Sequence, residues 1–282
     1  MKKLILIIAS VMLVAGIALL SFPTASNFIG SKVSRAQTDT FEERANHVIP
    51  NMTYEEAVKE GVVTKDGKYI GGKEGKTTVK SGDDNTEEYT EIVYEVGTPV
   101  IFQPDLDRLY EDVVAYNERV RKDQSSLLIN EEAYTESVID LEDYGIWDGI
   151  FGYLVIPTID MWLPVYLGAG EYNMSYGAAH MTYTTLPLGE ERSNSVIAGH
   201  TDYIGRIFFD NLRYLSVGDE VTFRNYWGNL DYKVVKTEIC APDESQDIYI
   251  SDDRDLLTLF TCIPDGYGDF NRYFVICERS EQ

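Results

Sequence analysis

The first pattern in the chain is an uncharged, largely apolar run from Leu4 to Phe22. As a helix it would be about 28 Å long, which is enough to cross the hydrocarbon core of a bilayer. Two lysines precede the run and the next charge is Lys32, so the positive-inside rule places the N-terminus in the cytosol. We expect residues 1–3 to be a cytosolic tail and residues 4–22 a single transmembrane anchor. A cleaved signal peptide is the alternative, because small residues are frequent from Ser21 to Ser26.

Residues 23–100 show no long periodic pattern, which predicts a stalk with a small, weakly structured insert. The sequence from Thr53 to Glu56 is a capping box and predicts the start of a short helix. Asp66-Gly67 lies between two short apolar runs and predicts a hairpin turn. A Gly-, Lys- and Asp-rich stretch follows from Gly71 to Asn85. No catalytic motif occurs here.

Helical spacing begins behind Asp105 and predicts an amphipathic helix within an extension over residues 101–145. The apolar positions of that helix are Leu106, Leu109, Val113, Tyr116 and Val120. A second helical stretch is predicted around Asn130 to Leu141.

Beyond Trp147 the chain becomes a series of short apolar or alternating runs separated by turn residues, which is typical of a β-barrel or β-sandwich. We expect helical turns at Glu171 to Tyr176 and at Ile207 to Leu215. Residues 146–282 are therefore predicted to form a mainly β domain. The strand candidates are Phe151 to Ile156, Leu163 to Leu167, Ser195 to His200, Asp219 to Arg224, Tyr232 to Cys240, Leu256 to Cys262 and Arg272 to Glu278.

Composition narrows the function. The 282 residues are 44% hydrophobic, enough for one good-sized core. With 24 basic and 47 acidic residues the net charge is −23, which makes nucleic acid an improbable partner and favours amine-bearing ones. Three cysteines are too few for a disulfide framework. The chain has no P-loop, no dinucleotide-binding glycine motif and no zinc-ligand spacing, so no cofactor is predicted.

Three reactive side chains lie where predicted strands end. Cys262 follows Thr258-Leu259-Phe260-Thr261, His200 follows an apolar run, and Arg272 starts the last strand. A thiol nucleophile needs a base near it and a donor for the oxyanion of its tetrahedral intermediate. These three residues could supply that set.

The pattern around these residues resembles the active site of sortases. Thr258 to Cys262 is followed ten residues on by Arg272 and preceded by Gly199-His200. Gly152 to Pro157 is similar to the first sortase strand and Leu163 to Tyr166 to the second. Further similar positions are Gly177-Ala178-Ala179-His180, Leu186-Pro187 and Phe208 to Asp219. The resemblance covers about Gly152 to Arg279 and implies a closed sortase-type β-barrel with short helices.

The resemblance also implies an activity and partners. A sortase is a transpeptidase that cuts an LPxTG-like sorting signal between Thr and Gly and transfers the acyl group to an amine. Cys262 would hold the acyl thioester, His200 would protonate the leaving amine, and Arg272 would steady the oxyanion, while Thr261 and Ala198 would contact the substrate. The partners would be surface proteins or pilins with a C-terminal sorting signal, and the barrel would lie outside the plasma membrane of a Gram-positive type cell.

The helical extension is similar to that of class C sortases, which polymerise pilins through a pilin lysine and carry a lid over the site. The lid would lie between Asp123 and Tyr144, with Tyr134, Tyr144 or Trp147 as its plug. The chain lacks the Asp-Pro-aromatic lid motif and a hydrophobic span after Glu278. A sortase that anchors proteins to a cell-wall cross-bridge amine is therefore the alternative. A different class of alternative is an inactive, membrane-tethered sortase-like scaffold.

The remaining reactive residues have structural explanations. Cys240 and Cys277 are expected to be buried core residues, with a mutual disulfide as the alternative. His180 is expected to hydrogen-bond within the fold, and Asp202 to be a loop residue. No metal ligand is predicted. The place where calcium would bind is an acidic connection that contains Asp243, Glu244, Asp247, Asp252 and Asp253.

Overall fold

The computed structural model describes residues 2–46, 54–59, 61, 63–64, 75–79, 88–92, 104–127, 135–203, 205–244 and 246–280. The predicted turn at Asp66-Gly67 and the candidate plug Tyr134 lie outside these residues.

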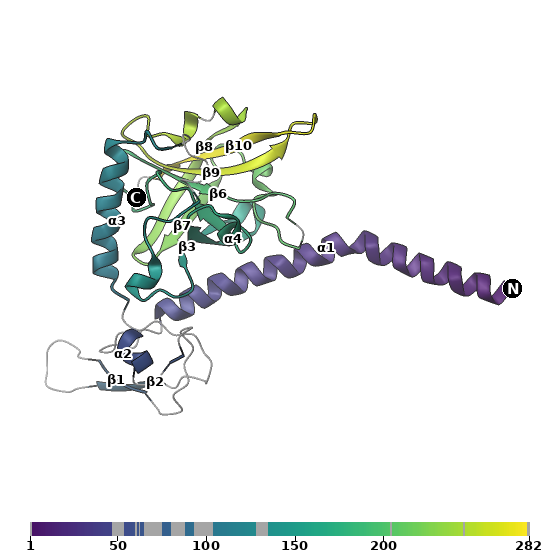
Figure 1. The fold of residues 1–282 in the computed structure, drawn as a ribbon, viewed down its shortest axis with the longest axis horizontal. Helices are drawn as coiled ribbons and strands as arrows, with labels where there is room; N and C mark the ends of the chain where they lie inside the picture. The colour runs from purple at the N-terminus through teal and green to yellow at the C-terminus, as the bar shows by residue number, and fades with distance from the viewer. Residues whose placement is uncertain are drawn as a thin grey trace.

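Eight strands close into a barrel in the order β10-β8-β7-β3-β4-β5-β6-β9 (Figure 1). Neighbouring strands are antiparallel except for the parallel pairs β4–β5 and β6–β9. The predicted mainly β, closed-barrel fold is therefore confirmed. The strands are β3 (Ile150–Ile156), β4 (Met161–Leu167), β5 (Ala178–His180), β6 (Ser193–Ala198), β7 (Glu220–Asn225), β8 (Gly228–Cys240), β9 (Asp255–Pro264) and β10 (Phe270–Arg279).

The barrel interior is filled by the side chains that alternate toward the inside along each strand. On β9 the side chains of Leu257 and Leu259 are fully buried in the main core together with Phe223 of β7. The flanking residues of the same strand face the other way: Leu256 belongs to a separate apolar cluster, and Phe260 packs against it. Because side chains alternate between the faces of a strand, this second cluster covers the outer face of β5, β6, β9 and β10.

Strand β5 was missed by the sequence analysis. It has three residues, all buried, and so shows neither alternation nor the length of an ordinary strand. Its pairing in parallel with β4 and antiparallel with β6 is what closes the barrel. Closure here depends on long-range pairing, which a short apolar run does not reveal.

Helix α3 (Leu106–Lys122) confirms the predicted amphipathic helix. The Asp105 side chain accepts from the backbone N–H of Arg108 and caps the first turn. Leu109, Val113 and the rest of the apolar stripe are buried against the barrel. The Asn117 side chain also fixes the helix in place, because it accepts from the backbone N–H of Leu186 at 2.8 Å.

The second predicted helix, around Asn130 to Leu141, is wrong for its described part. Residues 135–140 form turns and bends, and a short 3-10 helix, η1 (Leu141–Tyr144), follows. The Ser137 hydroxyl contacts the backbone of Ile139, and the Asp140 side chain accepts from the N–H of Glu142. Such local side-chain bonds compete with helical backbone bonds.

The other short helices surround the barrel. The predicted turn at Glu171 to Tyr176 is confirmed as α4 (Glu171–Met174), whereas only η3 (Leu212–Tyr214) is helical in the predicted stretch from Ile207 to Leu215. Three further 3-10 turns are η2 (Pro157–Ile159), η4 (Pro242–Glu244) and η5 (Gln246–Ile248).

Helix α1 (Lys2–Asn46) contains the predicted anchor and continues well beyond it. One half projects from the molecule and the other lies along the barrel (Figure 1). The docked half buries Phe41 against Ile150 and Tyr166, and Glu42 accepts from Tyr153 at 2.8 Å and from Arg224. The predicted stalk from residue 23 therefore begins as a helix bound to the barrel.

The rest of the predicted stalk holds three small elements. Helix α2 (Tyr54–Lys59) begins within the predicted capping box, and strands β1 (Gly75–Val79) and β2 (Glu88–Ile92) pair as an antiparallel two-stranded sheet.

Candidate functional site

Strands β9 and β10 bring Cys262 and Arg272 together. The two residues are direct partners in the antiparallel register. The Arg272 guanidinium donates from Nη1 to the Cys262 Sγ at 3.0 Å. The Arg272 Cζ atom also lies over the Phe260 ring, 5.7 Å from its centroid. This cation–π contact helps to hold the guanidinium beside the sulfur.

His200 reaches the same place from β6. This strand runs parallel to β9, with Ala198 opposite Phe260, and continuing the register by two residues sets His200 beside Cys262. Two side-chain bonds fix the strand ends to each other: the Thr201 hydroxyl donates to the Cys262 carbonyl at 2.6 Å, and the Thr261 hydroxyl donates to the Gly199 carbonyl at 2.7 Å. Strand pairing therefore assembles all three predicted catalytic residues.

The backbone before His200 depends on a glycine. A Cβ atom on Gly199 would lie 2.7 Å from the Phe209 ring, so a larger side chain does not fit there. The Phe209 N–H donates to the His200 carbonyl at 2.9 Å. The imidazole ring of His200 stacks on Tyr203, with centroids 5.6 Å apart and an interplanar angle of 15°. These contacts fix the direction of the imidazole.

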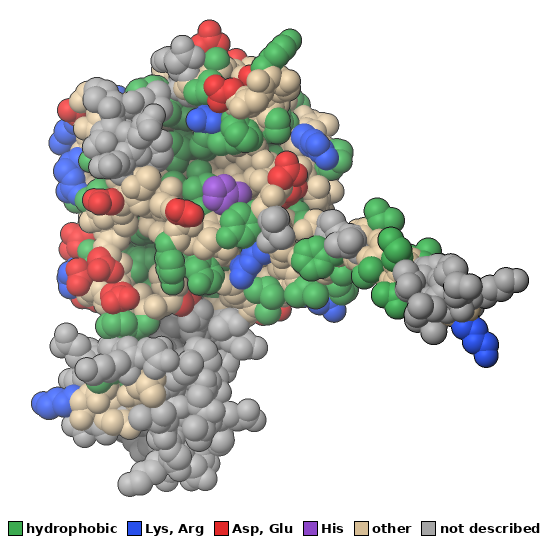
Figure 2. All heavy atoms as spheres, turned by 45° about the vertical axis from the view of Figure 1, so that its right-hand side comes forward, with side chains coloured by type: hydrophobic (Ala, Val, Ile, Leu, Met, Phe, Trp, Pro, Cys, Tyr) green, Lys and Arg blue, Asp and Glu red, His purple; other side chains and the backbone are tan. Residues whose placement is uncertain are grey.

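The site is partly open to solvent. Cys262, His200 and Arg272 are each of intermediate exposure. In Figure 2 a histidine side chain lies beside a hollow lined by hydrophobic side chains. Burial lowers the pKa of His200 below its ordinary value, and the nearby Glu171 carboxylate opposes this shift. The imidazole is thus biased toward its neutral, proton-accepting form.

Alternation along the strands puts the three residues on the outer barrel face. Cys262 shares the parity of Phe260, Arg272 that of Phe274, and His200 that of Ala198, all of which belong to or pack on the outer apolar cluster. That cluster therefore lies on the same face of the barrel as the site.

The two predicted substrate-binding residues differ in position. Ala198 is 2% exposed and lies in the outer cluster beside the site. Thr261 is 1% exposed and has the parity of the core residue Leu259, and its hydroxyl bonds to Gly199. Thr261 thus has an observed role in joining β6 to β9. Substrate contact by either residue stays a prediction.

Residue Leu127 belongs to the outer cluster and comes from the segment predicted to be a lid. Its side chain is 1% exposed. The segment is tied down on both sides of it: the Gln124 side chain contacts the backbone of Tyr183 and Ile250, and the Tyr249 hydroxyl donates to the Leu127 carbonyl. Part of the predicted lid therefore packs on the face that carries the site.

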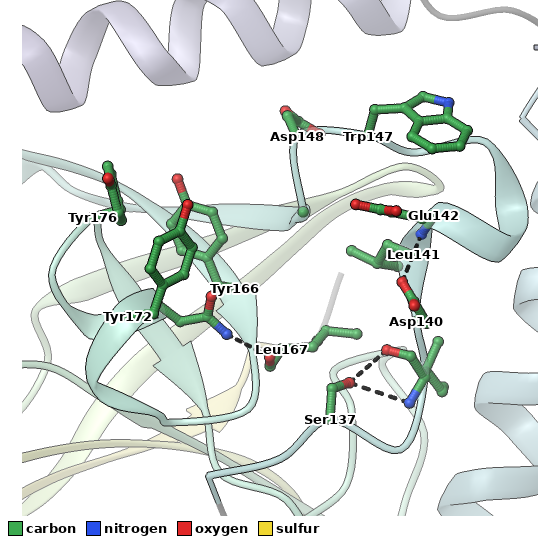
Figure 3. Close-up of a pocket in the computed structure, with 13 residues that line it drawn as sticks. Ser137, Asp140, Leu141, Glu142, Trp147, Asp148, Tyr166, Leu167, Tyr172 and Tyr176 are labelled. Atoms are coloured by element: carbon green, nitrogen blue, oxygen red, sulfur yellow. Dashed lines mark hydrogen bonds between the residues drawn. The ribbon is translucent and has the colours of Figure 1, made fainter. Parts of the chain in front are cut away.

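The candidate plugs Tyr144 and Trp147 lie elsewhere. The Tyr144 hydroxyl donates to Asp112 of α3 at 2.7 Å, and Arg108 lies over its ring. Trp147 lines a cavity of about 540 Å³ between η1, β4 and α4, where Asp148 and Glu142 lie opposite tyrosine side chains (Figure 3). None of the three catalytic candidates lines this cavity. The prediction of Tyr144 as a plug is wrong, because its contacts bind it to α3.

The other cysteines and histidine serve the fold. All three cysteines are free, so the alternative of a disulfide between Cys240 and Cys277 is wrong. Cys277 is fully buried, and burial raises the pKa of its thiol. The prediction that Cys240 is a buried core residue is wrong: it is of intermediate exposure and lies opposite Arg272 on β8, near the strand's end. The buried His180 ring contacts Thr184 and Thr185, and desolvation lowers its pKa to about 4.

The acidic connection before β9 is held by cations. Asp247 accepts from Lys236 at 2.9 Å, Asp252 is paired with Arg254, and Asp253 lies 3.8 Å from Arg192. Within the described part of the chain, no group of three or more His, Cys, Asp or Glu residues is arranged to hold a metal ion. Calcium binding at this connection stays a prediction.

The domain is a closed eight-stranded barrel that carries a thiol, a guanidinium and an imidazole near adjoining strand ends. Comparisons with known proteins identify the family that has this arrangement. Residues 154–280 match the sequence model of the sortase domain. Sortase D of Bacillus subtilis is 29% identical over 126 residues, which are 44% of this chain and 61% of that protein. Residues 154–280 are therefore the part of the chain that is similar to sortases, and the chain spans about three fifths of the length of this relative.

Solved structures extend the similarity. A sortase C1 of Streptococcus agalactiae has a TM-score of 0.56 at 27% identity, covering 63% of this chain and 91% of that one. A pilus-related sortase C of Group B Streptococcus has a TM-score of 0.55 at 25% identity, covering 63% of this chain and 90% of that one. These structural neighbours are class C sortases.

Several residues around the site had no signal in the sequence. Thr201, Tyr203 and Glu171 are common loop or helix residues whose relation to Cys262 and His200 comes from tertiary packing. The sequence shows that Thr201 directly follows His200. It does not show that the Thr201 hydroxyl binds the Cys262 carbonyl, because that carbonyl lies on another strand.

Proposed function

We propose that the protein is a membrane-anchored cysteine transpeptidase. It cleaves an LPxTG-like sorting signal between Thr and Gly and transfers the acyl group to an amine. The observation that carries this proposal is the 3.0 Å contact between the Arg272 guanidinium and the Cys262 sulfur, with His200 set beside them by the parallel β6–β9 register.

In the first half-reaction neutral His200 takes the proton of the Cys262 thiol, the sulfur attacks the Thr carbonyl carbon and a C–S bond forms. Arg272 donates to the oxyanion of the tetrahedral intermediate. Collapse breaks the C–N bond to Gly, and protonated His200 gives its proton to the leaving amine. The product is an acyl thioester on Cys262 and a free amino terminus.

In the second half-reaction an acceptor amine attacks the thioester carbon. Neutral His200 takes the proton that the amine loses, the C–S bond breaks, and the sulfur leaves as the thiolate, which takes this proton back from His200. The lowered pKa of His200 suits this step, because the neutral imidazole can accept a proton. One amide bond replaces another, so no external energy source is needed.

The acceptor that we propose is a pilin lysine. The class C neighbours support this choice, and one of them is described as pilus-related. The packing of Leu127 on the outer cluster supports a lid on the same face, and one neighbour is a lid mutant of Streptococcus agalactiae sortase C1. The lid would have to leave this face before a peptide binds.

The membrane anchor that we propose is the free half of α1. Over Ser10–Asp39 the helix is long and apolar enough to cross a membrane by length and composition, and the part that would span is the part before Gly30, where the helix meets the barrel loop. Large apolar side chains on the projecting part, including Leu20 and Phe22, are exposed. The barrel would then lie on the outer side of the membrane.

Incubation with a pilin and with cross-bridge peptides tests this function. The full chain should produce covalent pilin ladders that resist denaturation, Cys262→Ala should produce none, and Cys240→Ala should match the unmodified protein. Ladders with Cys262→Ala would contradict the proposal. Products formed only with cross-bridge amines would assign the protein to cell-wall anchoring instead.

A further inference from the structure

A second cavity, of about 650 Å³, lies where α1 meets the turn between β3 and β4. Its charged lining residues are Lys32 and Arg35 of the helix and Asp160 of the turn. The rest of the lining is polar or apolar. The cavity is therefore locally basic in a chain whose net charge is −23.

Both cations of this cavity lie over aromatic rings. The Lys32 Nζ is 4.8 Å from the centroid of the Phe28 ring, and the Arg35 guanidinium is 4.2 Å from that of Trp162. The ion pairs found in the described residues include neither cation. A guanidinium stacked on a ring still presents its N–H edge to an anion.

A buried hydroxyl also lines the cavity. Ser34 is 3% exposed, and its Oγ has no hydrogen-bond partner within the part of the chain that the structure describes. Buried polar atoms in native proteins are almost always bonded. An acceptor oxygen in the cavity would satisfy this hydroxyl.

The depth of the cavity follows from the helix. The apolar run ends at Phe22, and at 1.5 Å per residue Lys32 and Arg35 lie about 15 and 20 Å further along the helix axis, so the docked half of α1 must lie inclined to the bilayer normal for them to reach the head groups. The head-group layer of a bilayer is about 5–8 Å thick on each side. The exposed Phe28 and Ile29 side chains suit this boundary.

We propose that this cavity binds the phosphate of an anionic phospholipid head group in the outer leaflet, held by Lys32, Arg35 and the Ser34 hydroxyl. The inference rests on the membrane anchor proposed above. All 47 acidic residues follow Phe22, so an anionic membrane repels the barrel. A bound lipid offsets this repulsion where α1 joins the barrel and fixes the barrel relative to the membrane.

The test uses the full chain and begins with insertion into phosphatidylcholine vesicles, measured by resistance to alkaline extraction. The protein is then equilibrated in micelles with equal amounts of phosphatidylglycerol and phosphatidylcholine, and native mass spectrometry measures the lipid retained. We expect one phosphatidylglycerol to be retained at least tenfold over phosphatidylcholine. Lys32→Gln with Arg35→Gln should abolish the preference, and Ser34→Ala should weaken it.

The matched control is Arg119→Gln with Lys122→Gln, which removes the same charge from the exposed face of α3 and should keep the preference. The single variant Lys32→Gln changes an exposed side chain, so it tests the site even if the double variant misfolds. Equal retention of the two lipids, or an unchanged preference in the Lys32 and Arg35 variants, would overturn the inference while leaving the anchor intact.

Two more outcomes separate the sources of failure. Displacement of the retained lipid by millimolar glycerol phosphate would make this a site for free phosphate and overturn the lipid assignment. A full chain that is extracted from the vesicles would overturn the anchor and the lipid site together, whereas cleavage of a soluble sorting peptide would still report on the barrel.

Discussion

At the scale of single residues, stabilisation of the oxyanion depends on the planar guanidinium of Arg272, which has several directed N–H donors. Lysine keeps the charge but loses the guanidinium contact with the Phe260 ring and the directed N–H bond to the sulfur. Arg272→Lys should therefore lower kcat/KM for a sorting peptide by about 100-fold, the cost of removing one oxyanion donor. Steady-state kinetics checks this, with Arg254→Lys, at a surface pair with Asp252, as the control. A variant within threefold of the unmodified protein would exclude the oxyanion role.

The second residue-scale prediction concerns the pKa of His200. Burial lowers this pKa, and Glu171 raises it toward its ordinary value. Glu171→Gln removes the negative charge that favours the imidazolium, so the pKa should fall further. NMR titration can resolve this because the chain has three histidines. The acid limb of the pH–rate profile, where neutral His200 is lost by protonation, should then move to lower pH.

The exposed Glu111→Gln on α3 is the control for this titration, and it should leave the His200 signal in place. A His200 pKa that rises or does not change in Glu171→Gln would show that the carboxylate does not act on the imidazole.

At the scale of elements, the segment that contains Leu127 packs on the outer cluster, on the face of the barrel that carries Cys262. Leu127→Ala removes its buried contact with the outer cluster, so the segment should leave this face more often. The rate at which a thiol reagent labels Cys262 should rise about 10-fold, measured by mass spectrometry in a Cys240→Ser background. Leu106→Ala, at the start of α3, is the control. An unchanged labelling rate in a folded variant would contradict a lid here.

The docking of α1 on the barrel is also an element-scale feature. A Cβ atom on Gly30 would lie 2.3 Å from the Gly205 carbonyl oxygen, in the loop that follows His200. Gly30→Ala should therefore separate the helix from this loop and cost about 1–3 kcal/mol, which thermal unfolding in detergent would detect. Amide exchange in the loop should speed up as well.

Gly16 provides the matched control for this substitution, since a Cβ there meets nothing within 4 Å. Gly16→Ala should leave unfolding and exchange unchanged. If both substitutions behave alike, the contact between helix and loop does not position the loop.

For the whole molecule, the sequence predicted the features that repeat along the chain. The stripe of α3 and the alternation of the long strands are local periodicities, and both appear in the structure. Cys262, Arg272 and His200 could be named because each ends or starts a predicted strand. These three residues come together because β6 pairs with β9 and β9 pairs with β10 in the observed register. The order of the motifs along the chain was consistent with this arrangement but could not give the register.

The features that the sequence did not predict depend on long-range contacts. Strand β5 is too short for a periodicity, and α1 continues to Asn46 because residues such as Phe41 and Glu42 bind the barrel. The stretch before Leu141 has helical spacing, but Ser137 and Asp140 form local side-chain bonds that favour turns. Tyr144 could not be placed without knowing that Asp112 faces it.

The central claim is that Cys262 carries the acyl group, and intact mass spectrometry of the full chain during turnover of a sorting peptide tests it most directly. We expect a mass increase equal to the peptide acyl group, located on Cys262 by fragmentation, released by hydroxylamine and discharged by an added amine. Cys262→Ala should show no adduct, and Cys240→Ser should show the same adduct as the unmodified protein. An adduct on another residue, or turnover by Cys262→Ala, would contradict the account.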